Sequence, residues 1–195
     1  MKTIGITGGV GSGKSAVLDN IEKRYNACIL KADELANELK TPGSVCYNEL
    51  VELLGEMILE EGVIDNRKMA AAIFSDAKLL ERVNSVIHPR VKDEILRRME
   101  ECRNRGRYEL FILEAALLIE EGYDKILDEL WYVYADDKVR RQRLREGRGY
   151  SDDKITSIMD SQLSDAEFRK HCDRIIDNSG DIEDTMEQID ELLRE

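Results

Sequence analysis

The sequence of 195 residues contains only two prolines and thirteen glycines, which leaves no basis for a fibrous or low-complexity chain. It also lacks any apolar run that approaches the roughly 20 residues needed to cross a bilayer. The first residues enter a strand-like pattern directly, without the apolar segment of a signal peptide. We therefore expect a cytoplasmic protein that has no membrane partner.

Residues at metal-binding spacing are missing as well. The four cysteines include no C-x-x-C pair, and the chain has only two histidines, which argues against a structural zinc site. The net charge is −12, because 29 basic residues face 41 acidic ones. Binding to duplex DNA depends on neutralising phosphates, so we expect no nucleic-acid partner. A small anionic ligand could still bind in a locally basic cleft.

The residues that are present follow the pattern of an α/β protein. A hydrophobic fraction of 42% is enough for one domain with a substantial core. Short apolar segments separated by helical patterns favour a five-stranded parallel sheet covered by helices on both faces, giving three layers. The expected strands are Ile4–Ile6, Ala27–Leu30, Tyr108–Leu113, Leu130–Ala135 and Arg174–Asp177.

A long helical block interrupts the expected sheet. Between the second and third strands, over about residues 34–107, apolar residues recur at helical spacing. Because this block is too long for a simple crossover, we predict a helical lobe inserted in the sheet domain. The core of the single domain is expected over about residues 1–33, 108–137 and 162–195, and its last helix over Ile182–Leu193.

Residues 8–15 read Gly-Gly-Val-Gly-Ser-Gly-Lys-Ser and satisfy the pattern G-x-x-x-x-G-K-[ST]. The loop lies between an expected strand and an amphipathic helix, so its N–H groups and the positive helix end can surround phosphates. In such loops the lysine, here Lys14, reaches the β- and γ-phosphates, and the hydroxyl of Ser15 binds Mg²⁺. We therefore expect ATP and Mg²⁺ to bind here. The expected ATP-binding residues of this loop are Gly9, Gly11, Ser12, Gly13, Lys14, Ser15 and Ala16.

An arginine-rich stretch suggests which kind of phosphate-loop protein this is. The chain lacks the Asn-Lys-x-Asp sequence of a GTPase and the length of a motor ATPase. The inserted lobe and the arginines that follow Lys138 instead fit a small-molecule kinase. The lobe would bind the acceptor, and the arginine stretch, over about residues 138–161, would form a lid that closes over the transferring phosphoryl group and excludes water. The alternative is a solvated helix face. Arg143 and Arg148 are the leading candidates for a functional role.

Three further residues each allow two interpretations. Asp33 ends the second expected strand, where it could deprotonate an acceptor hydroxyl or cap the next helix. Glu114 ends the third strand and could hold a Mg²⁺-bound water or cap the following segment. His88 precedes Pro89 at an expected helix start, where a buried or capping histidine competes with a catalytic one.

Taken together, the motifs resemble those of the dephospho-coenzyme A kinase family along nearly the whole chain. The ordered set is more specific than the phosphate loop alone. It comprises Ala32-Asp33, Thr41-Pro42-Gly43, Gly62 to Arg67, Ile87-His88-Pro89, Glu114 to Glu120, Arg143-Leu144, Arg148 to Ser151, Gln162 and Ile176 to Gly180. The chain departs from the usual family pattern at Lys31, Ala116 and Gly147, where Asp, Pro and Arg are expected.

The resemblance implies transfer of the γ-phosphoryl group of ATP to the ribose 3′-hydroxyl of dephospho-CoA, the last step of coenzyme A synthesis. It implies that Asp33 is the base, that Lys14 binds the phosphates and that Arg143 or Arg148 is the lid arginine. It further implies an acceptor site that includes Arg67, His88 and Leu118, and a position near the adenine for Asn178. Another small-molecule or nucleoside monophosphate kinase is the main alternative. A nucleotide-binding regulator without turnover is the other.

Overall fold

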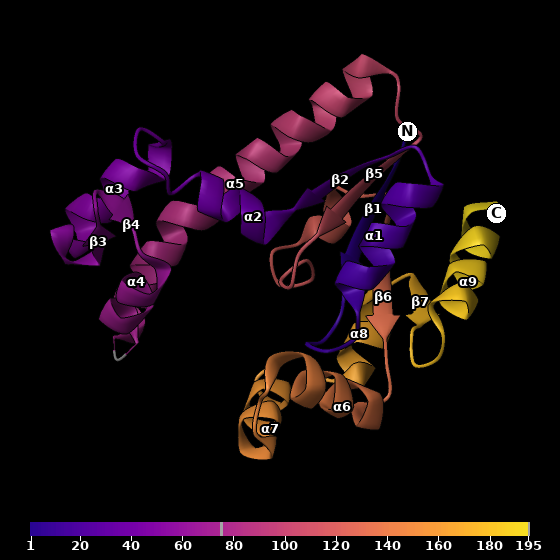
Figure 1. The fold of residues 1–195 in the computed structure, drawn as a ribbon. Coiled ribbons are helices and arrows are strands. Elements are labelled where there is room, and N and C mark those ends of the chain that lie inside the picture. The colour runs from indigo at the N-terminus through magenta and orange to yellow at the C-terminus, as the bar shows by residue number, and fades with distance from the viewer. Residues whose placement is uncertain (75, 195) are drawn as a thin grey trace. The chain divides into compact units, whose positions relative to one another are not determined.

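Five strands form one parallel sheet in the order β2-β5-β1-β6-β7 (Figure 1), which confirms the predicted fold class. The computed structural model describes residues 1–74 and 76–194. These strands are β1 (Lys2–Thr7), β2 (Ala27–Lys31), β5 (Leu110–Glu114), β6 (Glu129–Tyr134) and β7 (Arg174–Asp177). Each predicted strand exists, and the bounds differ by at most two residues.

Two compact units make up the chain. One consists of Met1–Leu30 with Arg105–Glu195, and the other of Lys31–Asn104. The first unit contains α1 (Lys14–Arg24), η2 (Tyr123–Lys125), α6 (Asp137–Arg148), α7 (Asp152–Asp160), α8 (Asp165–His171) and α9 (Ile182–Arg194). The second contains α2 (Ala32–Glu38), α3 (Val45–Leu54), η1 (Glu56–Ile58), β3 (Leu59–Glu60), β4 (Val63–Ile64), α4 (Asn66–Ile73) and α5 (Ala77–Arg105).

The core of the first unit lies between the sheet and the pair α1 and α9 (Figure 1). Ile4 and Ile6 of β1 and Trp131 of β6 are fully buried, because α1 and α9 pack against the sheet where these side chains lie. Helix α9 contributes Met186 and Ile189 at helical spacing, as predicted from its apolar stripe. The pairing of β1 with β5 places Ile6 opposite Glu114, near the carboxyl ends of both strands.

The second unit has its own apolar core, formed by α3, α4, α5 and a short hairpin. Its fully buried side chains include Cys46, Leu50 and Ile58. The hairpin β3–β4 was not predicted, because strands of two residues are too short to show an alternating pattern. Its turn has positive φ at Glu61 (49°) and Gly62 (80°), as a tight hairpin turn requires at both central positions.

One local prediction in this unit is wrong. His88 and Pro89 do not begin a helix but lie inside α5, which runs unbroken through 29 residues. Proline cannot donate a backbone hydrogen bond, so the carbonyl of Ser85 loses its usual helical partner there. The helix persists because packing of Val83, Val91 and Ile95 in the interior outweighs that loss.

No helix within residues 1–74 and 76–194 is both long and apolar enough to cross a membrane.

Candidate active site

The loop between β1 and α1 has the conformation expected for a phosphate site. Gly11 and Gly13 have φ of 78° and 90°, in the left-handed region that glycine enters without strain. Helix α1 begins at Lys14, so its unpaired first N–H groups and positive dipole end belong to the loop. The Nζ atom of Lys14 donates to the carbonyl of Gly8 at 2.7 Å, which bends the side chain back across the loop.

Asn178, the residue that follows β7, forms hydrogen bonds that support this loop. Its amide Nδ2 donates to the carbonyl of Ser12 at 2.7 Å, and its Oδ1 accepts from the hydroxyl of Thr185 at 3.0 Å. The side chain is buried, with 3% of Asn178 exposed. A Cβ at Gly13 would collide with the Asn178 amide, so only glycine allows this close approach. Asn178 therefore holds the loop's shape; the predicted contact with adenine stays a prediction.

Two arginines of α6 also contact the loop. Arg143 donates from Nη1 to the carbonyl of Ser12 at 3.2 Å and from Nη2 to the carbonyl of Asn178 at 2.9 Å. Arg140 donates from Nε to the carbonyl of Val10 at 2.9 Å, and its side chain is only 14% exposed. Both guanidinium groups thus lie against the loop, where they add positive charge to a protein that is acidic as a whole.

Sequence reasoning singled out Arg143 but missed the position of Arg140. Gln162, which follows α7, connects Arg140 to the loop: its Oε1 accepts from the N–H of Val10 at 2.9 Å and from Nη2 of Arg140 at 3.2 Å. Arg140 and Arg143 are three residues apart and share one helix face, which was the available signal. Arg148 lies at the exposed end of α6, with its guanidinium 5.9 Å from the ring of Tyr150, and the described contacts do not bring it to the loop.

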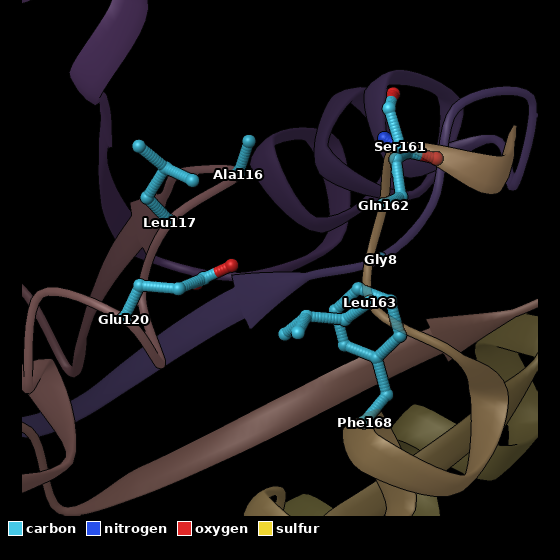
Figure 2. Close-up of a pocket in the computed structure, with 8 residues that line it drawn as sticks. All are labelled: Gly8, Ala116, Leu117, Glu120, Ser161, Gln162, Leu163 and Phe168. Carbon is cyan, nitrogen blue, oxygen red and sulfur yellow. The ribbon is translucent and has the colours of Figure 1, made fainter. Parts of the chain in front are cut away.

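A cavity of about 230 Å³ opens beside Gly8, at the start of the loop. Figure 2 shows Leu117 and Glu120 on one side of it and Leu163 and Phe168 on the other. The Phe168 ring stacks on Tyr132 of β6, with ring centroids 4.6 Å apart. Burial, followed by the nearby Asp165 carboxylate, raises the pKa of the Tyr132 phenol, so that side chain stays neutral.

The segment after β5 places two neighbouring leucines differently. Leu117 is 45% exposed and lines the cavity, whereas Leu118 is fully buried. Leu118 packs close to Gly5 with Leu127 and Leu130. Leu118 thus has no exposed surface in this structure, and its predicted contact with the acceptor stays a prediction. The sequence did not distinguish the two, because both fit an apolar run.

The remaining predicted residues belong to the second unit. Asp33 is exposed in the first turn of α2, whose N-cap position is Lys31, so Asp33 does not cap the helix. Arg67 is exposed in the first turn of α4, where the Asp65 carboxylate accepts the N–H groups of Arg67 and Lys68. His88 is half-buried on α5. The roles predicted for these three residues stay predictions.

The residues near the loop suit Mg²⁺ by their donor chemistry. Ser15 offers an exposed hydroxyl at the second position of α1, and Glu114 a carboxylate at the end of the strand next to β1. In the part of the chain that the structure describes, no three acidic, cysteine or histidine side chains gather into a complete metal site. Mg²⁺ ordinarily takes only one or two protein oxygens at such loops, with phosphates and water completing its shell.

Comparison with known families gives one result along nearly the whole chain. A family model described as Dephospho-CoA kinase matches residues 2–184. The dephospho-CoA kinase of Carboxydothermus hydrogenoformans is 35% identical over 192 residues, which cover 98% of this chain and 92% of that protein. The dephospho-CoA kinase of Corynebacterium glutamicum is 36% identical over 196 residues and covers both chains completely.

Solved structures agree with these sequence matches. The crystal structure of TT1252 from Thermus thermophilus has a TM-score of 0.82 and 30% sequence identity to this chain. The alignment covers 99% of this chain and 96% of that one.

Proposed function

Because the chain belongs to the dephospho-CoA kinase family, we propose that it transfers the γ-phosphoryl group of ATP to the ribose 3′-hydroxyl of dephospho-CoA. The products are coenzyme A and ADP. The observation that carries this proposal is the complete phosphate loop within a family match over residues 2–184. The expected partners are the two substrates, and we propose a cytoplasmic location because ATP, the phosphoryl donor, is available there.

The phosphate loop supplies the charge stabilisation that phosphoryl transfer needs. Lys14 and the N–H groups at the start of α1 would bind the β- and γ-phosphates. Arg143 and Asn178 hold the Ser12 peptide in place, so the loop is organised before ATP arrives. Mg²⁺, bound by the Ser15 hydroxyl and by a water on Glu114, would neutralise phosphate charge. The protein's task is then to position the reactants and exclude water.

Asp33 is the proposed general base. Its side chain is exposed in the first turn of α2, and no hydrogen bond or ion pair to it is found within residues 1–74 and 76–194. A carboxylate without such a partner is able to accept a proton from a bound hydroxyl. The acceptor oxygen would then attack the γ-phosphorus in line with the leaving ADP.

The second unit is the proposed acceptor lobe, with Arg67 and His88 as binding residues. We propose the segment around α6 and α7 as the lid, because Arg140, Arg143 and Gln162 connect it directly to the loop. The three contacts favour Arg140 and Arg143 over Arg148 as the lid arginines next to the phosphates. Movement of the lid would then change the shape of the phosphate loop itself.

The test is ADP release with ATP and Mg²⁺ and a panel of acceptors: dephospho-CoA, AMP, CMP and adenosine. Turnover with dephospho-CoA well above that with each other acceptor supports the proposal. Preference for AMP or CMP would instead make the protein a nucleoside monophosphate kinase. Binding of ATP without ADP release on any acceptor would indicate a nucleotide-binding regulator.

A further inference from the structure

Three polar residues of α2 and the turn after it lie on one side of the chain. Asp33, Asn37 and Lys40 are spaced i, i+4 and i+7, which is one face of a helix. Helical geometry continues past Glu38, because the N–H of Leu39 donates to the carbonyl of Leu35 at 3.0 Å. Lys40 thus shares a face with the proposed general base, about 10 Å further along the helix axis.

Asn66, the first residue of α4, holds this face in place. Its Oδ1 accepts from Nζ of Lys40 at 2.6 Å, and its Nδ2 donates to Oδ1 of Asn37 at 3.1 Å. One amide therefore fixes both the ammonium group and the helix that carries Asp33. The next residue of α4 is Arg67, the predicted acceptor contact. The same hydrogen bonds therefore also position the backbone from which the Arg67 side chain extends.

The ammonium group of Lys40 has no carboxylate bound to it, although it is half-buried. Within residues 1–74 and 76–194, Lys40 forms no ion pair, and its hydrogen-bond partner is a neutral amide. Burial lowers the pKa of Lys40, while the Asp33 carboxylate acts in the opposite direction. The neighbouring Cys46 of α3 is a neutral thiol, because burial raises its pKa. Glu38, the other acidic residue nearby on α2, is bound to Arg98.

A half-buried cation held by a neutral group still has its charge available for an anionic ligand. Lysine commonly binds phosphate groups, and it does so as a point charge. Dephospho-CoA carries a diphosphate on the same ribose that offers the 3′-hydroxyl. Only C3′, C4′, C5′ and the bridging oxygen separate the 3′-oxygen from the first phosphorus. An acceptor with its hydroxyl at Asp33 would therefore bring its diphosphate within the reach of a lysine side chain on the same face.

We propose that Lys40 binds the diphosphate of the acceptor and thereby selects diphosphate-bearing acceptors over free nucleosides. The inference rests on the proposed function, since it takes Asp33 as the base and dephospho-CoA as the acceptor. Asn66 is a positioning residue in this account: it touches the ammonium group and directs it, and it does not itself contact the acceptor.

The test compares Lys40→Met with wild type in steady-state turnover and in inhibition by adenosine, which has the ribose but no diphosphate. A lost charge-assisted hydrogen bond is expected to raise KM for dephospho-CoA by about 10- to 100-fold. The KM for ATP and the inhibition constant of adenosine are expected to change less than about twofold. Lys40→Arg keeps the charge and is expected to recover most of the lost affinity.

Lys68→Met is the matched control, because Lys68 is an exposed lysine of the same unit that is already paired with Glu60. Its KM values are expected to match those of wild type. If Lys40→Met does not fold, Lys40→Gln removes the charge while keeping a group that can hydrogen-bond to Asn66.

The outcomes separate the two proposals. An unchanged KM for dephospho-CoA in the folded Lys40 variants overturns the role of Lys40 and leaves the proposed function intact. An equal loss of affinity for adenosine and dephospho-CoA also overturns it, because Lys40 then acts on the shape of the lobe. A wild-type protein that does not turn over dephospho-CoA overturns both.

Discussion

Replacing Asn178 with alanine tests whether the phosphate loop is held from behind by a buried amide. The change removes the hydrogen bonds from Nδ2 to the Ser12 carbonyl and from the Thr185 hydroxyl to Oδ1. At about 1 kcal/mol net for each, the free energy of unfolding should fall by about 2 kcal/mol. For a chain of this length, that lowers the melting temperature by about 4–8 °C.

The same change should weaken ATP binding. If the whole loss falls on the loop conformer that binds phosphate, affinity for ATP drops by up to about 30-fold. Asn178→Asp should cost more, because it places a carboxylate oxygen against the Ser12 carbonyl, where no hydrogen bond is possible. Thermal melting and calorimetric titration with ATP measure the two effects.

Asn20→Ala is the matched control for this pair of measurements. Asn20 also donates an amide hydrogen bond to a backbone carbonyl, that of Ala16 at 2.9 Å, but on the exposed surface of α1. Its removal should change stability by less than about 0.5 kcal/mol. Melting and ATP binding of Asn178→Ala that match those of the control would show that the buried amide does not hold the loop.

Three further predictions concern the base, the lid and pH. Asp33→Asn should lower kcat by about 10²- to 10⁴-fold with ATP affinity unchanged, and wild-type turnover in that variant would exclude Asp33 as the base. Arg140→Gln should raise KM for ATP by about tenfold, because it frees the Val10 peptide that Arg140 holds. Arg141→Gln, one residue along α6, should not, and equal effects of the two changes would refute the contact's importance. Burial, followed by the hydrogen bond to Asp190, raises the pKa of Tyr25 to about 12. This stabilisation is complete below the ordinary tyrosine pKa of about 10 and is lost as pH rises toward 12. The melting temperature should therefore fall more between pH 8 and pH 11 for wild type than for Tyr25→Phe. Equal falls for the two proteins would contradict this.

The elements that could be predicted from the sequence are those with a local cause. Five continuous apolar strands and the amphipathic α9 have periodicities that need no tertiary information. The phosphate loop is similar, because the left-handed conformations at Gly11 and Gly13 depend on glycine at those positions. The order of the strands in the sheet, by contrast, was not predicted, since it depends on pairings between distant segments.

The errors and omissions arose where tertiary contacts decide. Pro89 would ordinarily mark a helix boundary, but packing of the helix on either side keeps it inside α5. The contact of Arg140 with Val10 joins residues 130 apart in sequence, and no local pattern encodes it. Leu117 and Leu118 are adjacent and chemically identical, yet one lines a cavity and the other is buried. Only the fold distinguishes such pairs.

The most direct test of the central claim is to identify the product formed from dephospho-CoA, ATP and Mg²⁺ by the purified protein. Mass spectrometry with phosphorus NMR reports both the added phosphoryl group and the hydroxyl that carries it. We predict one new phosphate, on the ribose 3′-oxygen, formed in equal amount to ADP. ADP release without this product, or a phosphate on another atom, would contradict it.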